Sequence, residues 1–380
     1  MKISIITHFY NNKNYGGVLQ SYALTKKLND MGYFTEQISY PIITKKLFDG
    51  ENKLKDFIKN ICRFLYLTFL KIKNYNKNQQ ANILDEEKDA FSIWVDKNIP
   101  HTQKVYTSKN IRKIVKQYDA FITGSDQVWN YDWYNKNYFL NFVPKQKIKI
   151  SYAASMGHNC ISEYRKQVYI KHLRSFDAIS VREKEMVELL KNDYTPKIQW
   201  VLDPVFLLEN KEWAEITDKP LINGDYAFCY FLGNDTLQQK LASEFCKRKN
   251  LKLVAIKNYT GSNNIDFIDE CLDDISPSAF LSLIKNAEYI FTDSFHAATF
   301  SGIFKKQVFI FHRASKKDMS SRLYSLFDFF DFKNNFCDTE EKKKIDYILS
   351  LKKIDYSQNN QNLQKMKNFS IDFLKNSLSN

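Results

Sequence analysis

The chain has 380 residues, of which 44% are apolar and 15% aromatic, so it is longer than one hydrophobic core usually organises and two globular domains are expected. Only 10 glycines and 7 prolines occur and no window repeats at a fixed period, which excludes solenoids, propellers and long disordered linkers. The formal net charge of +13 favours anionic partners, namely phosphates, nucleic acid or an acidic membrane surface. A background of solvated lysines accounts for the charge equally well.

The six cysteines lie far apart, with no CxxC pair and no histidine at ligand spacing beside any of them. The sequence therefore predicts neither a metal site nor a disulfide framework. The first residues lack the apolar core and the small-residue cleavage site of a signal peptide. We expect a cytoplasmic protein with reduced thiols.

The first half of the chain alternates strands and helices. A buried strand over 2–7 is followed by a loop and by a helix that opens at Gly16 and Gly17 and stops at Gly32. A strand over 34–40 completes a β-α-β start, which predicts a doubly wound parallel sheet with its ligand crevice beyond the carboxyl ends of the strands. Further strands are expected at 119–123, 148–153, 177–181 and 198–201, with a helix after 182.

A helical stretch over 52–97 interrupts this alternation. Its part at 57–71 is both basic and apolar, and it is too short and too charged to span a bilayer. Two interpretations stay open. The helix packs against its own domain, or it lies in a membrane interface and gives the protein a peripheral contact with the inner membrane face.

The second half repeats the pattern after Pro204, and we place the domain boundary between 205 and 206. The expected elements are a strand at 226–232, a helix at 235–249, a strand at 252–256, a helix from 276, a strand at 288–292, a helix from 295, a strand at 307–311 and a helix over 318–330. The fold class is thus α/β, with two doubly wound Rossmann-like domains, 1–205 and 206–359, facing a cleft as in the GT-B type. A terminal helix at 360–378 is a candidate to pack back on the first domain.

Two motifs follow strands of the first domain. Residues 14–20 (NYGGVLQ) combine a glycine joint with a helix N-terminus, which suits an anion or a close ligand, although a tight turn explains them as well. The spacing is neither GxGxxG nor that of a P-loop. Residues 124–130 (GSDQVWN) gather an aromatic ring, amides and a carboxylate, as a sugar site requires, and Asp126 is a candidate base. The alternative is a helix cap with a packed tryptophan.

Basic residues follow three strands that are expected to end at the ligand-binding edges of the two sheets. Arg182 and His296 each lie between a strand and a helix, and Arg313, Lys316 and Lys317 follow the strand at 307–311. Guanidinium and helix N-terminus can bind one anion, and imidazole titrates near neutrality. A salt bridge at Arg182, a structural histidine and a solvated basic loop are the alternatives.

Several motifs taken in order resemble the polysaccharide pyruvyl transferase family, from the first strand to about residue 330. They are NYGGVLQSYAL, GSDQVWN, YAASMG, SVREKE, WVLDPVFLL and TDSFHAATFSGIF. The resemblance implies phosphoenolpyruvate as a donor held mainly by the C-terminal domain and an acceptor sugar held mainly by the N-terminal domain. It implies a pyruvate ketal as product, with no metal and no organic cofactor.

Residue roles follow from the resemblance by position. Arg182 and Lys316 bind the donor's anionic groups and His296 is the general acid and base. Many relatives carry arginine at the position of Ser294, so Ser294, Arg313, Lys317 and Arg322 are further donor-binding candidates. The acceptor-binding candidates are Asn14, Tyr15, Gly16, Gly17, Gln20, Ser125, Gln127, Trp129 and Asn130, with Asp126 orienting or deprotonating the acceptor.

The acceptor is expected to be a cell-surface glycan, such as an exopolysaccharide or a capsule, or its lipid-linked precursor, and nucleic acid is not an expected partner. The main alternative function is a GT-B glycosyltransferase with a nucleotide-sugar donor, because fold does not fix function. A second alternative is a non-catalytic polyanion-binding protein recruited to a membrane by the 57–71 helix.

Overall fold

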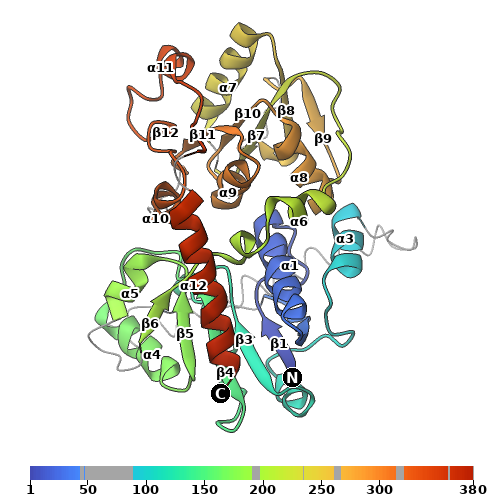
Figure 1. Cartoon of the computed structure of the whole chain (residues 1–380), viewed down its shortest axis with the longest axis vertical. Coiled ribbons are helices and arrows are strands. Elements are labelled where there is room, and N and C mark those ends of the chain that lie inside the picture. The colour runs from blue at the N-terminus through green and yellow to red at the C-terminus, as the bar shows by residue number, and fades with distance from the viewer. Residues whose placement is uncertain are drawn as a thin grey trace, which may run out of the picture.

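A computed structural model describes residues 1–42, 47, 89–190, 197–233, 235–260, 267–313, 321–357 and 360–379 (Figure 1). Within these residues the chain forms two parallel sheets of six strands each. The predicted helix at 57–71 lies outside the described residues. No helix in the described part of the chain is both long enough and apolar enough to cross a membrane.

The first sheet has the strand order β2-β1-β3-β4-β5-β6, and all of its pairs are parallel. Its strands are β1 (Lys2–Ile6), β2 (Phe34–Gln37), β3 (Ala120–Thr123), β4 (Ile148–Ala154), β5 (Ala178–Val181) and β6 (Ile198–Trp200). The helices of this domain are α1 (Tyr15–Asp30), α3 (Ala90–Asn98), α4 (Glu163–Leu173) and α5 (Lys184–Leu190). The strands are short apolar runs because a parallel sheet is buried on both faces, as all four residues of β3 are.

The second sheet has the order β12-β11-β10-β7-β8-β9 and is also parallel throughout. Its strands are β7 (Tyr226–Phe231), β8 (Lys252–Thr260), β9 (Glu270–Leu272), β10 (Tyr289–Thr292), β11 (Gln307–Phe311) and β12 (Phe336–Cys337). The helices are α7 (Thr236–Lys249), α8 (Pro277–Asn286), α9 (Phe295–Ile303), α10 (Ser321–Tyr324) and α11 (Ile345–Ser350). A 3₁₀ turn, Pro204–Leu207, and helix α6 (Asn210–Glu215) connect the two sheets.

The two domains are packed against each other over a continuous apolar cluster. Val18, Leu19 and Tyr22 of α1 belong to the same buried cluster as Phe280 of α8 and Phe300 of α9. The Tyr15 ring at the start of α1 stacks on Phe280 with centroids 4.5 Å apart, and its hydroxyl donates to the Ile275 carbonyl. The N-terminus of α1 is thereby held against the second domain.

The terminal helix α12 (Asn360–Leu378) runs back along the first domain and ends near β4, as Figure 1 shows. Its Phe373, Leu374 and Leu378 join the cluster that covers one face of the first sheet, together with Ile3 and Ile122. Ser370 on the same helix accepts a hydrogen bond from the Leu202 N–H at 3.0 Å. The last helix therefore belongs to the core that begins with the first strand.

The expected fold class is confirmed: the protein is an α/β structure with two doubly wound domains of the GT-B type. The helix expected over 318–330 is observed only in part among the described residues: α10 is followed by a 3₁₀ turn at Ser325–Asp328, and neither continues to 330. Leu326, Phe329 and Phe330 are all buried and follow the i, i+3, i+4 spacing of one helix face, which is the periodicity that predicted a helix here. The edge strands β9 and β12 are too short to be recognised from periodicity.

Leu374 offers a direct test of the contribution of α12 to the fold. Leu374→Ala leaves a cavity in a fully buried position and is expected to lower the free energy of unfolding by about 2–5 kcal/mol. Phe369→Ala on the exposed side of the same helix is the matched control, with an expected change within about 0.5 kcal/mol. Urea unfolding followed by circular dichroism measures both. Equal changes in the two variants would contradict the placement of α12.

Candidate active site

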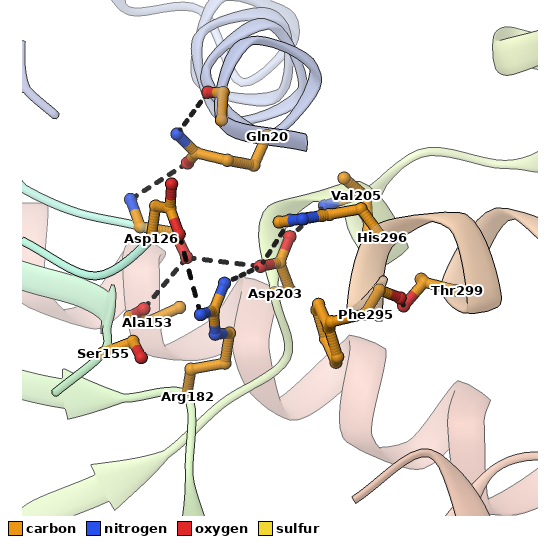
Figure 2. A network of polar contacts seen from close by, with 12 residues as sticks. Gln20, Asp126, Ala153, Ser155, Arg182, Asp203, Val205, Phe295, His296 and Thr299 are labelled. Carbon is orange, nitrogen blue, oxygen red and sulfur yellow. Dashed lines mark hydrogen bonds and ion pairs between the residues drawn. The ribbon is translucent and has the colours of Figure 1, made fainter. Parts of the chain in front are cut away.

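The predicted strand-end residues of both domains meet at the junction between the two sheets, as Figure 2 shows. Asp126 follows β3, Arg182 follows β5 and Asp203 comes shortly after β6. From the other domain, His296 lies in the first turn of α9, directly after β10. Parallel strands bring these positions together because their carboxyl ends share one edge of each sheet.

Asp203 is the centre of this network and is fully buried. Its Oδ2 accepts a hydrogen bond from Arg182 Nη1 at 2.8 Å and lies 3.5 Å from His296 Nε2. Its Oδ1 accepts from the Val205 N–H at 3.1 Å and thereby caps the 3₁₀ turn that leads to the second domain. One carboxylate thus contacts a side chain from each domain and the connection between them.

Charge pairing decides the ionisation of the two central groups. Burial by itself raises the pKa of Asp203, but His296 and Arg182 lower it by more, so the pKa lies well below the usual value of an aspartate. Burial lowers the pKa of Arg182, and Glu183, Asp203 and Asp126 raise it above its ordinary value. Both groups are therefore charged at neutral pH.

Arg182 is only 3% exposed and has carboxylates on several sides. Its Nε lies 3.4 Å from Glu183 Oε1, and its Nη2 lies 3.8 Å from Asp126 Oδ1. The Phe295 ring of the second domain lies 5.0 Å from the guanidinium carbon. Among the described residues Nη2 has no hydrogen-bond partner, so this nitrogen keeps donor capacity for an oxygen atom of a ligand.

His296 is 8% exposed and packs directly on the backbone of Gly16 in the other domain. A Cβ added at Gly16 would lie 2.0 Å from His296 Nδ1, so only glycine permits this approach of α9 to α1. Ser294 caps α9 by accepting a hydrogen bond from the Ala297 N–H. The predicted glycine joint therefore makes room for the imidazole.

The loop at 124–130 is held in place by buried hydrogen bonds. The Ser125 N–H donates to Gln20 Oε1 at 3.1 Å, and the Thr7 hydroxyl donates to the Ser125 carbonyl at 2.8 Å. Ser125 Oγ donates to the Ala153 carbonyl at 2.9 Å. Asp126 alone in this loop is not buried, and it has a positive φ of 62°. The loop thus directs one carboxylate toward Arg182.

The prediction that Trp129 stacks on a sugar is wrong. Its ring is fully buried and stacks on Phe139, and its indole N–H donates to the Tyr138 carbonyl. A side chain without an exposed face cannot stack on a sugar. The alternative of a packed tryptophan, which the sequence left open, is the one observed.

Other acceptor candidates also have structural roles in this conformation. Gln127 and Asn130 hydrogen-bond each other at 2.8 Å, and Gln20 donates to the Gly17 carbonyl at 2.7 Å. Tyr15 contacts the second domain, as described above, so its ring is not a free sugar platform. Asn14 caps α1 by accepting a hydrogen bond from the Gly17 N–H and is exposed to solvent.

The donor-binding candidates beyond Arg182 are only partly described. Arg313 follows β11, and its Nε lies 3.7 Å from Asp293 Oδ2, beside Ser294 at the edge of the second sheet. Asp293 also accepts the N–H groups of Leu232 and Gly233. Lys316 and Lys317 lie outside the described residues, and Arg322 lies in α10.

Sequence reasoning missed Asp203 and His8. Asp203 stands in the LDP segment, which was interpreted as a domain crossing and as part of a family motif with no role given to the carboxylate, and its partners are remote in sequence. Its position shortly after a strand was the available signal. His8 follows β1, and its Nε2 is buried without a hydrogen-bond partner among the described residues. No described group of three or more histidine, cysteine or carboxylate side chains is arranged to hold a metal ion.

Residues 14–314 match the sequence profile described as "Polysaccharide pyruvyl transferase". The chain belongs to the polysaccharide pyruvyl transferase family. The resemblance of its motifs is thereby confirmed, and the family is one of transferases. The matched region includes the whole buried network from Gly16 to His296.

Solved structures similar to this chain show the fold alone. UDP-GlcNAc 2-epimerase of Methanocaldococcus jannaschii has a TM-score of 0.53 and 11% identity, over 97% of this chain and 99% of that one. The S. aureus MnaA–UDP structure has a TM-score of 0.51 and 11% identity, over 100% of this chain and 98% of that one. UDP-GlcNAc 2-epimerase of Neisseria meningitidis bound to UDP-GlcNAc has a TM-score of 0.50 and 8% identity, over 100% and 99%.

One curated sequence relative is non-structural protein 1 of Rotavirus C. It is 22% identical over 228 residues, which are 59% of this chain and 48% of that protein. The chain therefore spans about half the length of the curated relative that it matches, and this likeness assigns no activity.

Asp203→Asn tests the central carboxylate of the network. Losing the charge leaves Arg182 buried with less compensation, so we expect a loss of about 3–5 kcal/mol in the free energy of unfolding at pH 7. The lowered pKa of Asp203 in the folded state means that its contribution is present above the ordinary aspartate pKa, about 3.9, and is lost as the pH falls below it. The difference between wild type and variant is therefore expected to shrink below pH 4.

Urea unfolding at intervals from pH 7 to pH 3 measures this difference. The matched control is Asp30→Asn, since Asp30 pairs with Lys26 on the surface and is 44% exposed at its side chain. The control is expected to change the free energy of unfolding by about 0.5 kcal/mol or less. A constant wild-type advantage over Asp203→Asn down to pH 3 would refute the assignment.

Gly16→Ala tests the contact between the domains. Alanine in place of glycine normally stabilises a helix by about 1 kcal/mol, whereas here the added methyl group meets the His296 ring, and we expect a loss of about 1–3 kcal/mol. Thermal unfolding measures the loss. Adding His296→Ala to the same chain should restore stability if the clash is its cause, and a double variant no more stable than Gly16→Ala would exclude that cause.

Proposed function

We propose that the protein transfers the pyruvyl group of phosphoenolpyruvate to a sugar, forms a pyruvate ketal and releases phosphate. The observation that carries the proposal is the position of His296, whose Nε2 lies 3.5 Å from a buried carboxylate that Arg182 fixes in place. An imidazole held by a carboxylate is suited to proton transfer. Membership of the family supports the reaction class.

The chemistry of an enol phosphate assigns His296 a proton-transfer role. Protonation of C3 by His296 makes C2 electrophilic, and a sugar hydroxyl oxygen forms a bond to C2 as its O–H bond breaks. The C2–O bond to phosphate then breaks, and a neighbouring hydroxyl closes the ketal. The two sugar hydroxyls lose one proton each. One of these protons replaces the proton given to C3, and the other leaves with the phosphate as hydrogen phosphate. Asp203 keeps the ring oriented.

Arg182 has two tasks in this proposal. Its Nη1 holds Asp203, and its Nη2, which has no hydrogen-bond partner among the described residues, binds an oxygen of the donor's carboxylate or phosphate. Ser294 and Arg313 lie at the edge of the second sheet and are the further described candidates for the donor's second anionic group. Lys316, Lys317 and Arg322 are carried as candidates by their positions in the sequence alone.

Access to this site requires the domains to move apart. Arg182 and His296 are 3% and 8% exposed, and α9 rests on Gly16. The donor and the acceptor therefore enter an open form, and closure returns His296 to Asp203. The acceptor belongs to a cell-surface glycan, such as an exopolysaccharide or a capsule, or to its lipid-linked precursor. A lipid-linked acceptor would bring the protein to the inner membrane face.

Calorimetric titration with phosphoenolpyruvate, together with phosphate release in the presence of a panel of lipid-linked saccharides, tests the proposal. His296→Asn is expected to keep donor affinity within a few-fold and to lower the rate of phosphate release by about 10²–10⁴. Arg182→Lys is expected to weaken donor binding. His172→Asn on α4, outside the site, is the matched control and should leave both quantities near wild type.

Two results would overturn this function. One is normal phosphate release by His296→Asn. The other is saturable binding of a nucleoside diphosphate with no binding of phosphoenolpyruvate, which would favour a glycosyltransferase that uses a nucleotide sugar. Mass spectrometry of the saccharide for an added pyruvyl ketal identifies the product and the acceptor together.

A further inference from the structure

A second group of polar side chains lies on the first domain and takes no part in the network around Asp203. His8 directly follows Thr7 at the carboxyl end of β1 and is 4% exposed. Tyr138 is fully buried, and its ring meets that of His8 edge to face, with centroids 4.7 Å apart. Neither His8 Nε2 nor the Tyr138 hydroxyl has a hydrogen-bond partner among the described residues. Two adjacent buried groups without partners indicate a ligand that supplies them.

Asp126 links this pair to the proposed catalytic centre. Its carboxylate acts on His8 through space and lies 3.8 Å from Arg182 on its other side. Burial lowers the pKa of His8, and Asp126 offsets only part of this effect. The imidazole is therefore neutral at physiological pH and able to accept a proton, with a carboxylate beside it to stabilise the charge that results.

The missing side chain of Gly17 lets α1 approach His8 and Asp126 closely. A Cβ at Gly17 would lie 3.1 Å from the His8 carbonyl oxygen and 3.3 Å from Asp126 Oδ2. The Asn12 side chain donates to the same carbonyl at 2.7 Å and fixes the backbone of His8. The start of α1, the end of β1 and the loop after β3 thus meet around one imidazole.

Trp133 adds an exposed aromatic surface to the group. Its side chain is 41% exposed, and its ring centroid lies 6.4 Å from that of His8. Asn130 holds it there: the Asn130 carbonyl accepts the Trp133 N–H, and the Asn130 side chain accepts the Asp132 N–H. An exposed aromatic face beside polar groups that lack partners is the arrangement that binds a sugar ring.

We propose that His8, Tyr138 and Trp133 form the acceptor-sugar subsite. Trp133 stacks on the pyranose ring and the Tyr138 hydroxyl hydrogen-bonds a ring substituent. His8 Nε2 takes the proton of the hydroxyl whose oxygen bonds to C2 of the donor, and this proton leaves later with phosphate. The subsite rests on the proposed function, in which His296 protonates C3, and it assigns the opposite proton transfer to the other domain.

Four variants separate the roles. Trp133→Ala is expected to weaken the binding of methyl glycosides of galactose, glucose and mannose by about tenfold, and Trp133→Phe should keep the binding near wild type because it keeps a ring. His8→Gln retains a hydrogen-bonding group and should bind the glycosides within a few-fold of wild type, yet release phosphate about 10² times more slowly. Tyr138→Phe should lower glycoside affinity without changing donor affinity.

Glycoside binding is measured by saturation-transfer NMR, donor binding by calorimetry with phosphoenolpyruvate, and folding by thermal unfolding of each variant. The expected pattern is unchanged donor affinity in all four variants, with losses confined to glycoside binding or turnover. Folded Trp133→Ala and His8→Gln proteins with wild-type glycoside affinity and turnover would overturn the subsite, as would a wild type that binds none of the glycosides. The protein could bind the glycosides in a way that depends on Trp133 and yet not bind phosphoenolpyruvate. That outcome would support the subsite and refute the proposed reaction.

Discussion

The buried carboxylate of Asp203 is the interaction on which the rest of the site depends. Removing a carboxylate from water costs several kcal/mol, and only close cations recover that cost. Arg182 Nη1, in the same domain, lies 2.8 Å from Asp203 Oδ2. His296 Nε2, in the other domain, lies 3.5 Å from the same oxygen. The charge of Asp203 is therefore stabilised most when both partners are in place. This ties the end of β5, the crossing after β6 and the start of α9 into one unit.

The sequence was sufficient to predict where the chemistry gathers, since strand ends of a parallel sheet share an edge. Arg182 and His296 were found by this rule, and the structure brings both to Asp203. The rule does not say which side chains are exposed. Trp129 and Trp133 are four residues apart in the segment after β3, yet the first is in the core and the second reaches solvent. Amides and aromatic rings serve buried hydrogen bonds and sugar binding equally well, so composition alone could not separate these roles.

The site features that could not be predicted from the sequence depend on contacts between distant segments. Gly16 was interpreted as part of an anion-binding turn, but its missing side chain is what admits the His296 ring from 280 positions later in the chain. Asp203 lies in a segment whose proline marks a crossing, and its role becomes visible only when Arg182 and His296 surround it. His8 belongs to none of the motifs recognised in the sequence. Its burial and its missing partner are properties of the folded chain alone.

On the proposed function, domain closure and proton transfer are coupled by this geometry. On the proposed function, His296 meets Asp203 only when α9 rests on Gly16, so an open protein that has bound the donor lacks its oriented acid. Premature protonation of the enol phosphate is thereby disfavoured until closure excludes water. Asp126, between Arg182 and His8, gives the acceptor side a matching connection to the same centre. On the proposed function and subsite, a carboxylate on each side of one arginine connects two histidines from different domains that make opposite proton transfers.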